Sequence, residues 1–219
     1  MKFKDDFYIP YTTPAFLKES ELLREKLSAL DFDTLKKTMK VSDKMAGKVY
    51  DLFHTGHSAR GCALLSYSGI AFQYMAPGVF TDREIEYVEN HLRILSGLYG
   101  VLRPLDQIEG YRLEMQTKLP FFPFSLYDFW KDALAQALDD EIILNLASEE
   151  YAKCIRPYKP LIDVRFRDVD GKEKGVYVKM ARGEMVRYMA EKNIERVEDI
   201  RHFDRQNFAF CPERSNSRL

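Results

Sequence analysis

The spacing of apolar residues predicts a series of amphipathic helices in the first fifty residues. Four leucines recur at helical spacing between residues 19 and 30. A second short helix is expected over residues 33–40, and a third begins after Ser42, a residue type that is favoured at helix N-termini. The pattern therefore predicts a helix, a tight turn and a further helix.

Two later helices have recognisable start signals. Thr81 and Glu84 have the spacing of a capping box, and an apolar stripe follows them as far as Leu95. Ser125 precedes a second such stripe that ends at Leu138. We expect the first of these helices to lead directly into the glycine-containing segment that follows it.

Short apolar or alternating runs predict strands between the helices. A hairpin is expected where residues 161–167 and 175–179 flank an Asp-Gly turn, and helices are expected after Lys179 and over residues 194–203. Other strands are predicted at residues 62–67, 111–115, 141–146 and 208–210, and a short strand or turn is predicted at residues 70–75. The predicted fold is a mixed α/β single domain over residues 1–219, with a central mixed β-sheet surrounded by helices.

Composition limits the classes of partner. The chain has 33 basic and 34 acidic residues, so its net charge of −1 excludes a histone-like binder and permits DNA binding only where basic residues gather on one face. It has no apolar run of the roughly 20 residues that a membrane helix needs, and no apolar signal segment at its start. Its three cysteines lie far apart, as is typical of reduced thiols. We expect a cytoplasmic protein without a membrane partner.

The segment from residue 95 to residue 115 combines backbone freedom with charge. Three glycines and one proline fall within it, so its shape is set by its backbone. It also carries two arginines and two acids, which need partners or water if they are buried. Its charged residues are Arg103, Asp106, Arg112 and Glu114. The segment is therefore either a solvated turn or the wall of a cleft.

These residues resemble the signature of the YaaA family of peroxide stress resistance proteins. The matching runs are 96–106 and 111–115, with further matches at 41–46, 145–151 and 179–183. The resemblance implies a role in the response to hydrogen peroxide and binding to DNA. Family members also begin and end with a strand that we do not find here, so we expect the N- and C-terminal strands of the family to be missing.

Lysines cluster around the predicted turn near residue 41. The arrangement resembles a helix-hairpin-helix, a module in which backbone N–H groups at a helix start bind a DNA phosphate. The lysines are Lys36, Lys37, Lys40, Lys44 and Lys48. The hairpin lacks the usual glycines, and its lysines alternatively only solvate a helical pair. The glycine-containing segment after residue 95 is a second candidate for the phosphate-binding turn.

Two further polar groups follow predicted strands. Asn145, Ser148 and Tyr151 lie where a strand ends and a helix begins, a common ligand position in α/β proteins, although Ser148 alternatively only caps the helix. Lys179 and Arg182 are delivered by a strand end and a helix start and form a plausible anion-binding group with Arg187. The alternative is a basic helix face balanced by nearby acids.

Two functions follow. The first is a DNA-binding protein of the oxidative stress response, whose basic cleft and helical turn contact the DNA backbone without reading much sequence. Its DNA or anion ligands are Lys40, Lys44, Lys48, Arg103, Arg112, Lys179, Arg182 and Arg187. The alternative is an enzyme acting on a nucleotide or nucleic acid, with acid–base candidates Asp106, Glu114 and Glu150.

No metal and no cofactor are expected. His54 and His57 have no acidic or thiol partner nearby in the sequence, so they make a weak metal pair and more simply end a helix. The chain also lacks a phosphate-binding glycine loop of the P-loop type. The sequence leaves the oligomeric state open.

Overall fold

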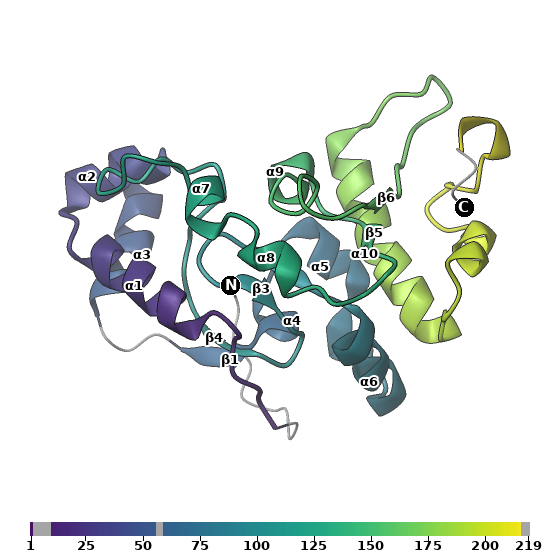
Figure 1. The fold of residues 1–219 in the computed structure, drawn as a ribbon, viewed down its shortest axis with the longest axis horizontal. Helices are drawn as coiled ribbons and strands as arrows, with labels where there is room; N and C mark the ends of the chain where they lie inside the picture. Colours follow the sequence, from purple (N-terminus) through teal and green to yellow (C-terminus); the bar gives the residue numbers. More distant parts are fainter. Residues whose placement is uncertain (2–9, 56–58, 216–219) are drawn as a thin grey trace. The chain divides into compact units, whose positions relative to one another are not determined.

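The structure, a computed structural model, describes residues 1, 10–55 and 59–215, and its elements fall into two compact units (Figure 1). Its mixed α/β class agrees with the sequence-based prediction. His57 of the histidine pair and the last four residues lie outside the described ranges. Unit 1 comprises Met1–Ser66, Arg93–Glu141 and Ala147–Leu161, and unit 2 comprises Tyr67–Leu92, Ile142–Leu146 and Ile162–Leu219.

Unit 1 begins with the three helices that the apolar spacing predicts. Its helices are α1 (Leu17–Ser28), α2 (Phe32–Met39), α3 (Asp43–His54), α4 (Ala63–Ser66), α7 (Leu126–Trp130), α8 (Ala133–Gln136) and α9 (Glu149–Ala152). Leu23 and Leu27 of α1 are fully buried, whereas Leu22 is exposed. The buried pair lies four residues apart on one helical face, and that face packs towards α3.

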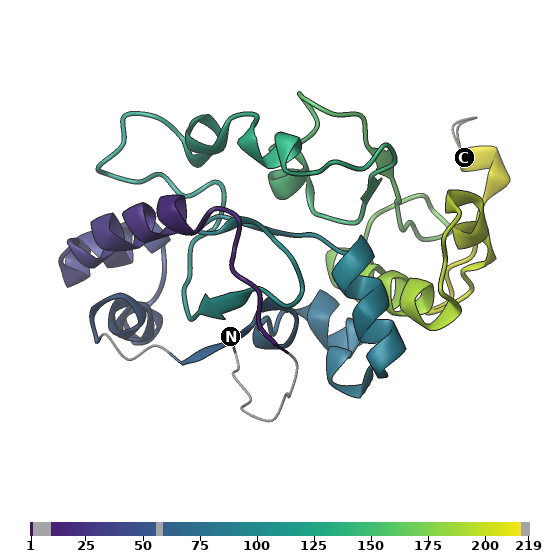
Figure 2. The same ribbon diagram turned by 60° about the horizontal axis from the view of Figure 1, so that its bottom comes forward.

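Four short strands of unit 1 form two antiparallel pairs. The strands are β1 (Arg60–Cys62), β2 (Ile94–Ser96), β3 (Gly100–Leu102) and β4 (Gln107–Glu109). Strand β1 pairs with β4, and β2 pairs with β3 in a hairpin. The chain before α1 joins this region, because Thr12 N–H donates to the Leu105 carbonyl and the Thr12 carbonyl accepts from the Gln107 N–H. Figure 2 shows the ribbon of this region from a second side.

Unit 2 is organised around the long helix α10. Its elements are α5 (Ile70–Met75), η1 (Pro77–Val79), α6 (Asp82–His91), β5 (Leu144–Asn145), β6 (Ile162–Asp163), α10 (Gly175–Lys192), η2 (Val197–His202) and η3 (Pro212–Arg214). Helix α10 packs against α5 and α6. A Cβ at Gly183 would lie 2.0 Å from the Ala71 carbonyl oxygen, so only glycine permits this close crossing of α10 and α5.

The predicted hairpin over residues 161–179 is wrong. The Asp-Gly turn is present, with Gly171 at φ 79°, but residues 175–179 form the first turns of α10. Strand β6 instead pairs in parallel with β5. The valine and tyrosine residues of this run favour a strand by local propensity, yet Val178, Ala181 and Met185 are buried at helical spacing. Packing of that face overrides the local preference.

Other predicted elements also differ. Residues 70–75 form helix α5 instead of a strand or turn. The helix after Thr81 ends at His91 instead of continuing to Leu95, and no strand forms at residues 111–115 or 208–210. Within the described ranges, the strands form three two-stranded sheets in place of one central sheet. In the same residues, no helix combines the length and apolarity needed to cross a membrane.

Candidate functional site

The turn between α2 and α3 is built by a lysine in a left-handed conformation. Lys40 has φ 51° and ψ 50° and ends α2. Its N–H donates to the Lys37 carbonyl at 3.3 Å, and the Val41 N–H donates to the Lys36 carbonyl at 3.5 Å. These bonds form the Schellman-type ending that usually takes a glycine. The sequence lacks this glycine because Lys40 occupies its position.

The start of α3 is left without a side-chain cap. Asp31 accepts the Thr34 N–H at 2.8 Å and thereby caps α2. Ser42 occupies the equivalent position before α3 with an extended backbone, but its hydroxyl makes no capping bond. The Met45 N–H donates to the Ser42 carbonyl at 3.0 Å, whereas the N–H groups of Asp43 and Lys44 receive no side-chain cap within the described part of the chain. They belong to the same turn that carries Lys40.

The lysines of this hairpin differ in their surroundings. Lys36 forms an ion pair with Asp43, whose carboxylate raises the pKa of Lys36. Lys40, Lys44 and Lys48 are exposed, and no ion pair found among the described residues involves them. Lys44 and Lys48 lie four residues apart, so they share one face of α3. We name Lys40, Lys44 and Lys48 the lysine group of unit 1.

The glycine-containing turn after β2 is buried and faces the interior of unit 1. Ser96 Oγ accepts the N–H groups of Leu98 and Tyr99 at 3.2 and 2.9 Å, and it lies 2.6 Å from the Tyr111 hydroxyl. Residues 96–102 are all buried. Burial keeps the backbone of this turn from solvent among the described residues, so we retain the turn between α2 and α3 as the candidate for phosphate binding.

Glycine is required twice in this buried turn. A Cβ at Gly97 would lie 2.5 Å from the Leu113 carbonyl oxygen, and Gly100 has φ 71°. The Gly97 carbonyl accepts the indole N–H of Trp130 at 3.2 Å. We name residues 95–115 the signature segment. Its backbone thus contacts the Leu113 carbonyl through Gly97 and the Trp130 indole through the Gly97 carbonyl.

Asp106 is buried and holds the chain before α1 against the signature segment. Its carboxylate accepts the Thr12 hydroxyl at 2.7 Å and the Arg103 N–H at 2.8 Å. The side chain is 1% exposed. The sequence proposed Asp106 as an acid–base candidate, and the structure uses both of its carboxylate oxygens in local bonds.

The other charged residues of the signature segment lie at the surface of unit 1. Arg103 and Glu114 are exposed, and Arg112 is half-buried. Arg112 donates to Glu114 at 2.7 Å, so these two charges compensate each other. An anion that binds Arg112 would compete with this carboxylate.

Tyr151 lies in a half-buried polar cluster of unit 1. Burial is the main cause that raises the pKa of Tyr151, and the neighbouring Tyr111 and Glu150 raise it further. Burial also raises the pKa of the Cys154 thiol to about 12, with Glu150 adding to the effect. Glu150 itself is half-buried, and its side chain accepts the Gln116 N–H at 3.3 Å. Ser148, which begins α9 beside this cluster, makes no capping bond with its hydroxyl.

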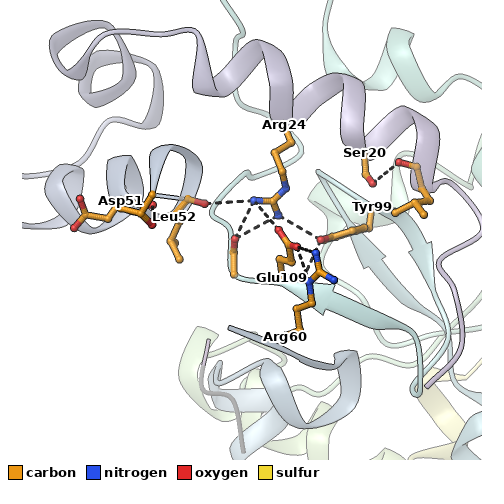
Figure 3. A network of polar contacts seen from close by, with 10 residues as sticks. Ser20, Arg24, Asp51, Leu52, Arg60, Tyr99 and Glu109 are labelled. Atoms are coloured by element: carbon orange, nitrogen blue, oxygen red, sulfur yellow. Dashed lines mark hydrogen bonds and ion pairs between the residues drawn. The ribbon is translucent and has the colours of Figure 1, made fainter. Parts of the chain in front are cut away.

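Sequence reasoning did not find the polar network around Arg24, which Figure 3 shows between α1, α3 and β4. The Arg24 guanidinium donates to the Leu52 carbonyl at 3.4 Å and to the Tyr99 hydroxyl at 3.3 Å, and it lies 3.7 Å from the Glu109 carboxylate. Glu109 also pairs with Arg60 at 2.7 Å. These partners and the Gly110 carbonyl, which also accepts from Arg24, lie 28 to 86 residues from Arg24 in sequence, so no local spacing signals the network.

Arg24 therefore ties the last turn of α3 to the signature segment. It donates to the Gly110 carbonyl as well as to Leu52, and its side chain is 21% exposed. Most of the guanidinium is held by protein acceptors, which fits a positioning role better than ligand binding. Two members of the lysine group, Lys44 and Lys48, thus lie on a helix that Arg24 connects to residues 99–110.

The predicted residues of unit 2 do not share one environment. The Asn145 amide donates to Asp163 at 2.7 Å across the β5–β6 pair. Lys179 is exposed and Arg182 is half-buried, and they lie three residues apart on α10. Burial lowers the pKa of Arg182, and its Nε has no hydrogen-bond partner within the described part of the chain.

Arg187 is charge-compensated. It donates to Glu191 at 2.7 Å, and Arg205 bridges the same carboxylate and Glu184. With roughly 100° of rotation per residue, Arg187 also projects about 140° away from Arg182 around α10. The alternative that we considered for this helix, a basic face balanced by acids, describes Arg187 but not Lys179.

Comparison with known proteins gives one consistent result. The family model described as "Peroxide stress protein YaaA" matches residues 1–214. The chain is also similar to proteins named UPF0246 from Desulfitobacterium hafniense (43% identity; 99% of this chain and 91% of that protein), Agathobacter rectalis (41%; 96% and 90%) and Lactobacillus acidophilus (40%; 99% and 90%). The matches extend through both units.

Proposed function

This chain belongs to the family of the peroxide stress protein YaaA, and on that premise we propose that it binds DNA through the lysine group of unit 1. The observation that supports the proposal most directly is the exposure of Lys40, Lys44 and Lys48 around one helical turn. Their ammonium groups would contact successive phosphates of the DNA backbone. Such contacts position a protein on DNA without reading sequence.

The backbone of the same turn supports this proposal. The start of α3 has no side-chain cap, and the positive end of the helix dipole favours an anion there. Asp43 is the first residue of this helix, and it is compensated by its ion pair with Lys36. A phosphate at the turn would therefore meet N–H groups and lysines rather than an unpaired carboxylate.

Lys179 and Arg182 supply a second candidate phosphate contact in unit 2. Lys179 is exposed and Arg182 is half-buried less than one helical turn away, and both ammonium and guanidinium groups are strong donors to phosphate oxygens. Both residues lie in the run 179–183, one of the segments that match the YaaA family in sequence. We assign it a smaller share of the affinity, because Arg187 of the same helix is already compensated by Glu191.

A gel-shift and fluorescence-anisotropy series tests the proposal. The test variant is Lys44→Gln with Lys48→Gln, and the matched control is Lys153→Gln, which removes an exposed lysine elsewhere in unit 1. We expect the double variant to bind duplex DNA roughly tenfold more weakly at moderate salt, because two phosphates no longer meet a cation. The control should bind like the wild type. Equal binding by all three proteins would exclude Lys44 and Lys48 as DNA contacts.

A second candidate function rests on the Tyr151 cluster. Titratable groups with perturbed pKa values gather at catalytic sites more often than elsewhere, and the pKa values of Tyr151 and Cys154 are both raised, mainly by burial and further by the nearby Glu150. This arrangement suits acid–base chemistry on a nucleotide or nucleic acid. The test is hydrolysis of nucleotides and DNA by the wild type and by Glu150→Gln. Activity that survives this substitution would remove the cluster from the mechanism.

A further inference from the structure

A partly exposed group of stacked phenylalanines lies before and within α7. The Phe122 ring stacks on Phe124 with centroids 4.7 Å apart and on Phe129 with centroids 5.5 Å apart, at interplanar angles of 17° and 22°. The outer ring, Phe124, is 44% exposed. We name Phe122, Phe124 and Phe129 the aromatic ledge. It offers a flat apolar face to solvent in unit 1.

A hollow of about 290 Å³ adjoins the ledge. It is lined by Phe124, Asp128, Phe129 and Lys131, so it combines two aromatic rings with one group of each charge. Asp128 is partly committed, because its Oδ2 accepts the Ser125 N–H at 3.0 Å and the Ser125 hydroxyl at 2.6 Å. The Lys131 side chain is exposed at the rim. The size approaches the lower limit of small-ligand pockets, roughly 300 Å³.

Lys131 has a backbone conformation that a side chain disfavours. Its φ of 45° and ψ of −128° lie outside the regions that residues with a Cβ ordinarily occupy. The conformation is fixed by the end of α7, where the Lys131 N–H donates to the Tyr127 carbonyl at 2.8 Å. Glycine would adopt it without strain. A lysine at this position points to a use for its charge that offsets the conformational cost.

We propose that the aromatic ledge and Lys131 bind an unpaired nucleobase of DNA together with its phosphate. The base would stack on the exposed face of Phe124, and the Lys131 ammonium would contact the adjoining phosphate. Aromatic stacking accepts any base, and a neighbouring cation adds the backbone contact, which is how proteins commonly bind single strands. The inference rests on the proposed function, and it adds a structural preference to it.

The occupant is identified by the charge as well as by the rings. Hydrogen bonds from Ser125 lower the pKa of the neighbouring Asp128, and the Lys131 ammonium already lowers it further, less strongly. An apolar protein segment would use the rings but offer this ammonium no further anion. A nucleotide supplies both a flat ring and an anion at a short distance from each other. The ledge and the lysine group both belong to unit 1. Phe121, which precedes the ledge, has its ring centroid 6.0 Å from the Lys26 ammonium of α1.

The test compares two DNA duplexes that differ by one looped-out 2-aminopurine. Anisotropy measures affinity, and quenching of 2-aminopurine fluorescence reports stacking. The wild type should bind the looped-out duplex roughly tenfold more tightly and quench its fluorescence. Phe124→Ala should abolish this preference and the quenching while leaving affinity for the fully paired duplex unchanged. Tyr158→Ala removes another exposed aromatic ring of unit 1 and should behave like the wild type.

The variant Lys131→Gly tests whether a loss of DNA preference could result from misfolding. It relieves the strained backbone, so the variant should melt at a higher temperature while its preference for the looped-out duplex falls several-fold. Equal wild-type affinity for the two duplexes, or a preference that survives Phe124→Ala, would overturn the proposal that the ledge binds a nucleobase and leave the proposed DNA binding unaffected. Absence of binding to either duplex would overturn the proposed function and the ledge with it. Loss of self-association in Phe124→Ala without any DNA preference would identify a second copy as the occupant and overturn the inference.

Discussion

Lys40 combines two roles that a substitution can separate. Its left-handed backbone costs a side-chain-bearing residue roughly 1 kcal/mol relative to glycine, and its charge serves the proposed DNA contact. We predict that Lys40→Gly raises the free energy of unfolding by roughly 0.5–1 kcal/mol in urea titrations, and at the same time weakens DNA binding. A variant that is more stable and binds DNA as tightly as the wild type would show that the Lys40 ammonium does not contact DNA.

Cys154 should be unreactive in the folded protein. Burial and the neighbouring Glu150 raise the pKa of its thiol from 9.0 to about 12, so its thiolate fraction at pH 8 is roughly a thousandfold smaller than that of an ordinary thiol. We predict that iodoacetamide at pH 8 labels the exposed Cys211 and spares Cys154, as read by peptide mass spectrometry. Labelling of Cys154 at the rate of Cys211 in native protein would contradict this.

The same shift has a consequence for stability. The unfolded thiol ionises near pH 9, whereas the folded thiol stays protonated up to about pH 12. The contribution of Cys154 to stability is therefore fully present below pH 9 and disappears as the pH rises from 9 towards 12. Cys154→Ala should show a shallower decline in stability over this interval than the wild type, as measured by urea titrations at several pH values.

At the scale of elements, a substitution in the β2–β3 turn tests whether the close backbone contact at Gly97 stabilises the fold. We predict that Gly97→Ala destabilises the protein by roughly 2–4 kcal/mol, because its Cβ would lie 2.5 Å from a backbone carbonyl oxygen. The matched control is Gly47→Ala in α3, where the added Cβ would meet no described atom within 4 Å apart from its chain neighbours and the backbone of its own helix. The control should be neutral or stabilising by up to about 1 kcal/mol. Equal effects in thermal denaturation would contradict the close approach.

Local chemistry made some elements predictable. Thr81 and Ser125 both form the caps expected of them, because the bonds involved span only three residues. The first three helices follow from buried residues at helical spacing. Interactions of this kind involve only residues that are close in sequence, so they do not depend on the packing of distant segments.

Other elements depend on partners that are distant in sequence. Residues 70–75 form a helix that packs against α10, roughly a hundred residues later, and this contact is invisible to a local pattern. Residues 175–179 have strand propensity but share a buried face with Met185. The same distinction holds for the predicted site residues. The exposure of Lys44 could be predicted from its position on a helix, whereas the hydrogen bond between Thr12 and Asp106 joins residues 94 positions apart and could not.

At the scale of the whole molecule, net charge gives no general attraction to DNA. The chain carries a charge of −1, so any affinity must come from local groups such as the lysine group of unit 1. Binding through a few phosphate contacts is strongly salt-dependent, because each contact releases counterions from the DNA. The number of phosphates that the protein neutralises can therefore be read from the salt dependence alone.

The measurement that tests the proposed function most directly is the dependence of duplex affinity on salt, for the wild type and for the triple variant Lys40→Gly, Lys44→Gln and Lys48→Gln. The slope of log K against log salt should become shallower by roughly 0.9 for each phosphate that is no longer neutralised, or about 2.7 in all, while circular dichroism shows the fold retained. A triple variant that is folded and has the slope of the wild type would contradict the proposal that these lysines bind DNA.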